Sequence, residues 1–414
     1  MVEVKYALDT FYFLVSGALV MWMAAGFAML EAGLVRAKNT TEILTKNIAL
    51  YSLSCIMFLL MGYQIMYGSP EGGWLPNFSF LLGDEHSAES IKAGNADHSL
   101  YSDFFFQVVF VATAMSIVSG AVAERMKLSA FLMFTVVLTG FIYPVEGYWK
   151  WGSGFLHTLG FNDFAGSAIV HMAGAAAALA GVILLGPRTG KYNQQGQAKG
   201  IPGANLPLAT LGTFILWMGW FGFNGGSQLA LSNIENANAV AKIFVNTNAA
   251  AAGGVIAVFL YTRLRYRVSD LTLILNGALA GLVAITAEPL TPSPWVATLI
   301  GGVGGLLCSV SITVLDKLKL DDPVGAISVH GVAGIFGVLV VPLTNEGATM
   351  TAQLIGLVCI FAWVFTTSFA VWWILKKVVG IRVSQEEEYV GMDKVDCGLE
   401  AYPEFTTVSG QNGR

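Results

Sequence analysis

The chain has 414 residues, of which 55% are hydrophobic and 12% carry a charge, and its formal net charge is −5. Soluble domains carry about 25% charged residues, so this composition excludes an ordinary soluble protein. The negative charge comes largely from residues 68–103 and from the segment after residue 383. It gives no indication of nucleic-acid binding, and no nucleic-acid partner is expected.

Long apolar runs account for the low charge. A helix needs about 20 mostly apolar residues to cross a bilayer, because lipid offers no partner to a free backbone amide. The runs near residues 270 and 328 are short for isolated spans. The sequence predicts an all-α polytopic membrane protein with eleven transmembrane helices, at residues 8–35, 47–67, 104–123, 128–147, 164–186, 205–224, 240–262, 270–287, 294–315, 328–343 and 352–375.

The positions of the basic residues give an independent prediction of topology. If the N-terminus lies outside and the chain crosses eleven times, the inner segments hold 18 of the 22 Lys and Arg residues. This bias fits the positive-inside rule, and a miscounted helix would destroy it. The C-terminus is therefore expected in the cytoplasm, and the lysines that remain outside are Lys5, Lys92, Lys150 and Lys242.

The ends of the chain define the domain organisation. The first apolar run is too long for a signal peptide and has no small-residue cleavage site, so we expect a retained helix. Residues 1–378 are interpreted as the transmembrane domain and residues 379–414, which are acidic and polar, as a cytoplasmic tail. The four cysteines form no close pair, so neither a disulfide nor a zinc knuckle is expected.

One motif occurs twice. Residues 163–171 read DFAGSAIVH and residues 322–330 read DPVGAISVH, both following Asp-x2-Gly-x3-Val-His. A weaker pair is GFAMLEAG (26–33) and GWFGFNGG (219–226). The pairs lie five spans apart, so the halves 8–186 and 205–343 must cross the membrane in opposite senses, with 352–375 as an extra helix. Inverted repeats are typical of transport proteins whose pathway lies between the halves.

Two histidines occupy equivalent points of the repeat. His171 and His330 lie inside apolar spans, where ionisable groups are costly and generally mark an ion or proton pathway. Symmetry predicts that both imidazoles meet in a net-neutral pair that relays a proton, with packing as the alternative. Two ligands without a nearby cysteine or carboxylate make a poor metal site, so neither metal nor cofactor is expected. The remaining histidines, predicted in solvated outer loops, are His86, His98 and His157.

Three carboxylates accompany the spans. Asp163 and Asp322 precede helical stretches, where Asp is a favourable N-cap. Asp322 is interpreted as a cap; Asp163, on the outer side, is equally a cap or a residue that favours an arriving cation. Glu31 is expected to make a structural hydrogen bond inside the bundle.

Aromatic residues are dense, and most are expected to pack or to anchor the protein at the membrane interface. A ring face also attracts a small cation, most strongly when it is desolvated. Candidates at predicted outer ends of spans or in outer loops are Phe106, Phe110, Trp151, Trp220, Phe221 and Phe223.

Several motifs in order resemble the ammonium transporter (Amt/Mep/Rh) family, on its Amt/Mep branch. They cover nearly the whole chain and include GFAMLEAGLVRAKN (26–39), FVATAMSIVSGAVAER (110–125), DFAGSAIVH, GWFGFNGGS (219–227), FVNTNAAAAGG (244–254), DDPVGAISVHGVAG (321–334) and GLEAY (398–402). The resemblance implies a homotrimer in which each subunit has its own hydrophobic pore. It also implies nitrogen uptake across a cell membrane, most simply a bacterial inner membrane.

The resemblance assigns roles to matching positions. The outer cation site would comprise Trp151, Phe110 and Ser227, supported by Asp163. Phe110 and Phe223 would form a stacked gate, Trp220 would line the route, and the twin histidines would be His171 and His330. The tail is expected to pack against the inner face and to help a PII-type regulatory protein close the pore. Two positions depart from the common pattern, which often has Asp at Gly325 and His at Cys397.

The expected activity is ammonium or methylammonium transport. Ammonium can lose its proton and pass as ammonia through a dry pore, whereas potassium cannot. An ammonium sensor with little flux and a channel for another small neutral molecule are the alternatives. A membrane enzyme is not expected, because the sequence contains no nucleophile–base constellation.

Overall fold

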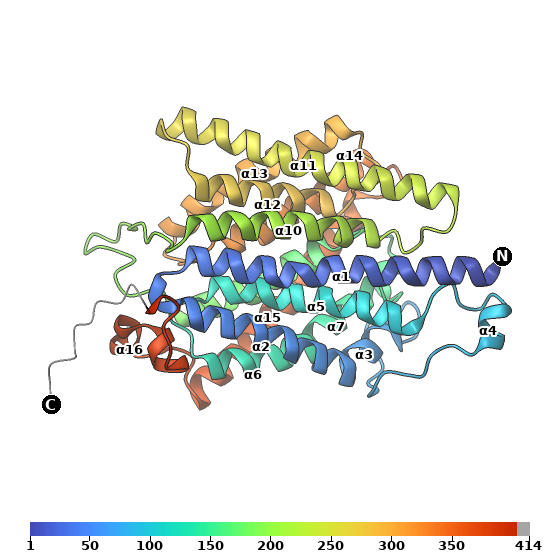
Figure 1. Ribbon diagram of the computed structural model, residues 1–414, viewed down its shortest axis with the longest axis horizontal. Coiled ribbons are helices and arrows are strands. Elements are labelled where there is room, and N and C mark those ends of the chain that lie inside the picture. Colours follow the sequence, from blue (N-terminus) through green and yellow to red (C-terminus); the bar gives the residue numbers. More distant parts are fainter. Residues whose placement is uncertain (404–414) are drawn as a thin grey trace.

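The computed structural model describes residues 1–403, which form helices and no β-strand. The helices run side by side along the long axis, with the N-terminus at one end and α16 at the other (Figure 1). In chain order the elements are α1 (Val2–Leu34), η1 (Ala37–Asn39), α2 (Thr40–Met57), η2 (Phe58–Gly62), α3 (Tyr63–Tyr67), α4 (Ala88–Lys92), α5 (Leu100–Ala121), α6 (Leu128–Val137), η3 (Leu138–Ile142), α7 (Tyr143–Lys150), α8 (Phe155–Thr158), η4 (Ser167–Met172), α9 (Ala173–Leu185), α10 (Leu206–Gly226), α11 (Ile234–Tyr266), α12 (Leu271–Thr286), α13 (Pro294–Lys317), η5 (Ile327–Val332), α14 (Ala333–Thr344), α15 (Met350–Val378), α16 (Gln385–Val390) and η6 (Asp393–Cys397).

Ten helical segments within residues 1–403 are long and apolar enough to cross a membrane, and α12 is a shorter apolar helix. Together they are compatible with the eleven predicted crossings. At about 1.5 Å per residue, α12 is too short to span lipid comfortably. It packs against α11 and α13, and its residues 275–286 are all buried, so protein rather than lipid surrounds it.

The predicted start of the second span was wrong. Residue 47 was expected to begin it, but α2 begins at Thr40 and follows the short turn of η1. The hydropathy pattern misses the first two turns of α2 because they contain Glu42 and Lys46. Both side chains are buried, and their charged groups lie 3.8 Å apart on successive turns of the helix. A search for apolar residues does not detect a pair of opposite charges that is buried inside a helix bundle.

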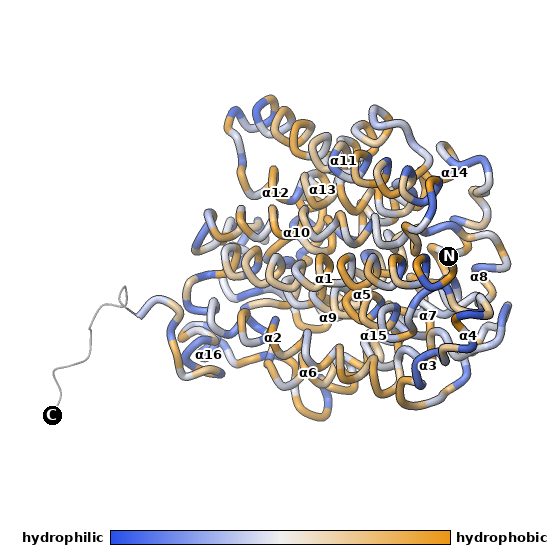
Figure 2. The backbone as a smooth tube through the Cα atoms, turned by 45° about the vertical axis from the view of Figure 1, so that its right-hand side comes forward, coloured by the Kyte–Doolittle hydropathy of each residue, from blue (hydrophilic) through white to orange (hydrophobic). Residues whose placement is uncertain are grey.

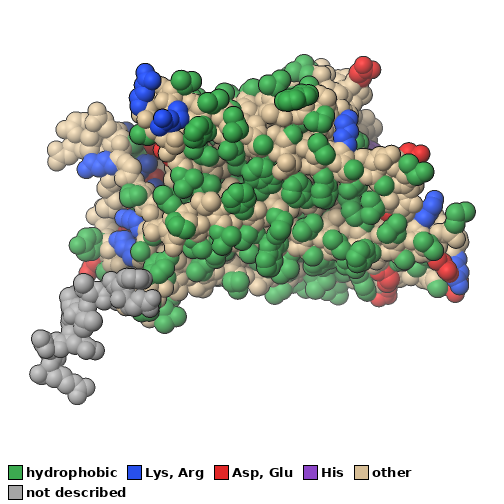
Figure 3. Space-filling view, turned by 45° about the horizontal axis from the view of Figure 1, so that its top comes forward, with side chains coloured by type: hydrophobic (Ala, Val, Ile, Leu, Met, Phe, Trp, Pro, Cys, Tyr) green, Lys and Arg blue, Asp and Glu red, His purple; other side chains and the backbone are tan. Residues whose placement is uncertain are grey.

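An apolar band surrounds the bundle. Hydrophobic residues predominate along the middle of the helices, and hydrophilic segments gather toward the two ends (Figure 2). On the face drawn in Figure 3, most Lys and Arg side chains lie at the end that carries the tail, and most acidic side chains lie at the opposite end. Exposed apolar side chains in this band include Phe214 of α10, Leu299 of α13 and Val358 of α15. Exposed apolar area of this extent suits lipid contact.

The two halves meet along equivalent elements. α1 and α10, the first spans of the halves, pack along each other. In the fifth spans, α9 contacts η5 and α14 contacts η4. This reciprocal packing brings the two copies of the repeated motif together at the centre of the bundle.

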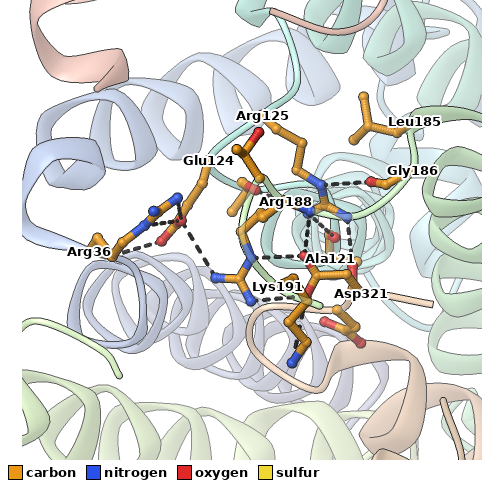
Figure 4. Close-up of polar contacts among 12 residues, drawn as sticks. Arg36, Ala121, Glu124, Arg125, Leu185, Gly186, Arg188, Lys191 and Asp321 are labelled. Carbon is orange, nitrogen blue, oxygen red and sulfur yellow. Dashed lines mark hydrogen bonds and ion pairs between the residues drawn. The ribbon is translucent and has the colours of Figure 1, made fainter. Parts of the chain in front are cut away.

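A buried charge cluster joins four loops at the basic end (Figure 4). Arg188 binds both carboxylate oxygens of Asp321, with Nε and Nη2 each 2.9 Å from an oxygen, and its Nη1 lies 3.5 Å from Glu124. Arg36 binds the other side of Glu124, and Arg125 donates to backbone carbonyls, including that of Asp321 at 2.6 Å. Burial alone would raise the pKa of Glu124, but Arg188 and Arg36 hold it below its ordinary value.

Candidate functional site: a ring-lined conduit

The repeated motif builds the same local structure twice. Each Asp carboxylate accepts backbone N–H groups just downstream, at 2.7–3.3 Å. Asp322 therefore makes the predicted cap contacts, and Asp163 makes those of the first of its two alternatives. The donors are Ser167, Ala168 and Ile169 for Asp163, and Val324, Gly325 and Ile327 for Asp322.

The glycine of each motif turns the chain into a π-helical segment. Gly166 has φ +108° and Gly325 has φ +81°, values that L side chains rarely adopt. A Cβ on Gly325 would also lie 2.9 Å from Asn276 Nδ2. Glycine at this position, noted above as a departure, is thus the residue that its backbone favours. Each turn then directs a histidine, His171 in η4 or His330 in η5, toward the bundle centre.

The structure brings the two histidines together. His330 Nδ1 lies 3.1 Å from His171 Nδ1, and the side chains are 3% and 0% exposed, respectively. A neutral imidazole carries one N–H and one acceptor nitrogen, so one ring donates and the other accepts in this contact. A proton can cross such a pair without leaving a charge when one ring takes up a proton at Nε2, gives its Nδ1 proton to the other ring, and that ring releases its Nε2 proton.

A file of ring contacts leads from the cavity to this pair. Trp151 meets Phe110 edge-on, with centroids 6.0 Å apart, and Phe110 stacks on Phe223 at 4.1 Å. Phe223 stacks on His171 at 5.2 Å, and His171 stacks on His330 at 5.1 Å. Phe110 and Phe223 are 1% and 0% exposed, and their rings fill the space between Trp151 and His171.

The structure separates two aromatic residues that lie next to each other in the sequence. Trp220 stacks on His171 with centroids 5.0 Å apart, and its Nε1 donates to Thr286 Oγ1 at 2.8 Å, which fixes the indole beside the route. Phe221 instead stacks on Phe244 of α11 at 5.1 Å. Of these two aromatic candidates, Trp220 therefore lies beside the file of rings, and Phe221 lies away from it.

The end of the file at Trp151 opens into a cavity of about 280 Å³. Phe106, Phe110, Trp151 and Ser227 all line it, so three of the predicted substrate-binding residues share one space. Asp163 is not among the lining residues. It is fully buried, and its backbone carbonyl accepts a hydrogen bond from Trp151 Nε1 at 3.3 Å, which positions the indole.

Sequence reasoning missed several polar residues of this cavity. Asp103, Gln107 and Lys150 also line it. Asp103 was assigned to the outer loop because the predicted span began at 104, whereas α5 begins at Leu100. Its spacing of seven residues from Phe110 places both on one face of a helix, and that signal could have identified it.

Beyond the histidine pair, a small cavity of about 10 Å³ is lined by both His330 and Glu31. Glu31 Oε2 accepts hydrogen bonds from Asn47 Nδ2 at 2.9 Å and Ser119 Oγ at 2.7 Å. These contacts agree with the structural hydrogen bonding predicted for Glu31. The volume suffices for about one water molecule.

The described part of the tail contacts the basic end of the bundle. Glu388 of α16 accepts from the backbone N–H and the hydroxyl of Thr189, at 2.7 and 2.9 Å. Asp393 accepts from the backbone N–H of Glu42, and Cys397 Sγ lies 3.7 Å from Thr45 Oγ1. The tail therefore bridges α2 and the loop after α9. Residues 404–414 of the predicted tail lie outside the described residues.

Comparison with known proteins agrees with this architecture. Residues 11–402 match the model of the Ammonium Transporter Family. The chain is 41% identical to ammonium transporter Amt2 of Archaeoglobus fulgidus, covering 96% of this chain and 88% of that protein. It is 42% identical to a putative ammonium transporter of Synechocystis, covering 96% and 89%, respectively.

Solved structures share the fold. A sensor Amt protein superposes with a TM-score of 0.89 at 34% identity, covering 96% of this chain and all of that one. Mep2 of Candida albicans superposes with a TM-score of 0.82 at 25% identity, covering 94% and 89%. The relatives are named as transporters rather than enzymes. This chain belongs to the ammonium transporter family.

Proposed function

We propose that the protein recruits ammonium at Trp151, Phe110 and Ser227, removes its proton there, and passes ammonia between Phe110 and Phe223 to the histidines. The proton follows through His171 and His330, and ammonium re-forms at the inner side. Family membership supports ammonium transport as such.

The observation that carries the finer mechanism is the 3.1 Å contact between two buried imidazoles at the end of a closed file of rings. A cation that keeps its charge loses hydration in such a conduit without gaining a counter-ion. Potassium must keep its charge, whereas ammonium can leave a proton behind. Proton transfer across a neutral imidazole pair then lets transport carry current.

The test is solid-supported membrane electrophysiology on purified protein in liposomes, comparing ammonium, methylammonium and potassium. We expect currents with the first two and none with potassium. Equal currents with ammonium and potassium would refute the deprotonation step. Ammonium uptake without current would refute the proton relay.

Trp151→Leu is expected to raise the ammonium concentration for half-maximal current by about 5–30-fold, the loss of a desolvated cation–π contact. The substitution keeps an apolar side chain against Phe110. Phe221→Leu is the matched control, because that ring stacks away from the file, and it should leave the half-maximal concentration unchanged. A similar shift in both variants would remove Trp151 from the cation site.

The proposal includes the assembly of the protein and its orientation in the membrane. The protein is a homotrimer in a cell membrane, most simply a bacterial inner membrane, with the N-terminus outside and the tail in the cytoplasm. The basic residues at the tail end support this orientation through the positive-inside rule. Residues 1–378 form the transporter domain, and the tail from 379 offers a docking region for a PII-type regulatory protein.

A second candidate is an ammonium sensor with little flux. The specific observation in its favour is the 34% identity to a protein named as a sensor Amt. Equilibrium binding of methylammonium without measurable current in liposomes would select the sensor over the transporter.

A further inference from the structure

The outer cavity contains a carboxylate beside its aromatic rings. Asp103, in the first turn of α5, is half-buried and lines the same 280 Å³ space as Phe110 and Trp151. Aromatic faces attract a cation only at short range, whereas a fixed negative charge attracts it from farther away. The position of this carboxylate therefore matters for a cation that enters from solution.

Two hydrogen bonds hold Asp103 in place. Tyr63 Oη donates to Oδ2 at 2.6 Å, and Gln107 Nε2 lies 3.4 Å from Oδ1. A short O–H···O contact of this kind favours the ionised carboxylate. No ion pair found within residues 1–403 includes Asp103, so no lysine or arginine neutralises it directly.

The cavity also holds a group that opposes a cation. Lys150 lines it, as does its neighbour in the chain, Trp151. The ammonium group of Lys150 repels a monovalent cation as strongly as a carboxylate at the same distance attracts it. The balance between Asp103 and Lys150 thus sets the electrostatic potential that an entering cation meets.

We propose that Asp103 is a cation-recruiting residue of the outer site, which holds ammonium-type monovalent cations ahead of the aromatic rings and acts against Lys150. This inference rests on the proposed function. Asp103 lies two helical turns, about 10 Å along the axis, from Phe110. A charge attracts potassium and ammonium alike, so Asp103 governs how much cation arrives, while the dry conduit governs which cation passes.

Asp103→Asn keeps the size of the side chain and an acceptor for Tyr63 but removes the charge. We expect the half-maximal ammonium concentration to rise about threefold to tenfold at low salt, the effect of one charge at ~10 Å in a partly solvated site. The maximal current and the exclusion of potassium should not change. The shift should shrink at high ionic strength, because salt screens charges over about 10 Å at 0.1 M.

Two further variants separate charge from structure. Lys150→Gln should move the half-maximal concentration in the opposite direction by a similar factor. Asp97→Asn, which removes an exposed outer carboxylate, should leave it unchanged. An unchanged value in Asp103→Asn at low salt, or an equal rise in Asp97→Asn, would overturn the proposal. If Asp103→Asn does not fold, Asp103→Glu takes its place. This variant should keep the half-maximal ammonium concentration of the wild-type protein, and a rise in that concentration would overturn the proposal.

Titration calorimetry with methylammonium keeps this inference distinct from the proposed function. A wild-type protein that binds but carries no current would refute transport, and the Kd of Asp103→Asn would still have to rise by the same factor. Normal wild-type current with an unchanged Kd in Asp103→Asn would refute recruitment alone.

Discussion

Replacing His171 or His330 by alanine is expected to let potassium carry a current that the wild-type protein does not support. Removing one ring leaves a gap beside an imidazole whose Nδ1 has lost its partner at 3.1 Å. A polar gap of that size fills with water, and a water-filled passage admits a hydrated ion. The measurement is the potassium current in liposomes, relative to the ammonium current of the same preparation.

Leucine at either position provides the matched variant. Its side chain fills much of the space of the imidazole but has no nitrogen, so the conduit should stay dry and potassium should stay excluded. The ammonium current should fall by roughly 100-fold, the scale on which a positioned proton-transfer group acts. If potassium exclusion and ammonium current both survive in each alanine variant, the pair is not the selective element.

The sequence could predict the spans and the histidine pair because each leaves a regular signal. A helix in lipid has to be apolar over a fixed length, and the repeat spacing placed His171 and His330 at equivalent points. The distance between their rings follows from reciprocal packing of the motifs, and the fold bears out that packing. The start of α2 was missed because it leaves no such signal. Its buried Glu42 and Lys46 form an ion pair, which hydropathy alone does not register.

The cavity was less predictable, because the packing of α10 against several neighbouring helices decides which rings meet. Trp220 and Phe221 have the same local sequence context, yet one stacks on His171 and the other on Phe244. Composition does not distinguish the two faces of α10. For Asp103, an error of a few residues in the start of a helix moved a cavity-lining carboxylate into a loop.

Asp321→Asn is expected to destabilise the fold by about 3–5 kcal/mol, the cost of leaving a buried charge without its partner. Asp321 is fully buried and accepts from Arg188 Nε and Nη2, both at 2.9 Å. Asparagine keeps the shape but leaves the Arg188 guanidinium with Glu124 alone, at 3.5 Å. Thermal unfolding of the detergent-solubilised protein should show a midpoint lower by about 5 °C.

The pH dependence of this difference follows from the pKa of Asp321. Burial alone would raise it, but the hydrogen bonds and charge of Arg188, with the charge of Arg125, lower the pKa of Asp321 to about 2. A carboxylate with a depressed pKa stabilises the fold above its unfolded pKa, about 3.9, and loses that effect as the pH falls through the folded pKa. The gap in midpoint between wild type and Asp321→Asn should therefore stay constant from pH 7 to 5 and close only between about pH 4 and 2.

Asp316→Asn is the control from the same segment of the chain. Asp316 pairs with Lys191 at 2.9 Å, but its side chain is 33% exposed, so water reaches the pair. Lys191 itself is buried, and it keeps the Asp321 carboxylate at 3.9 Å when Asp316 is replaced. Exposed pairs contribute about 0–1 kcal/mol, and this variant should unfold within about 1 °C of wild type. The larger loss of stability expected for Asp321→Asn depends on the burial of the carboxylate rather than on its pairing with a basic residue. Equal losses in Asp316→Asn and Asp321→Asn would contradict it, as would a gap that closes between pH 7 and 5.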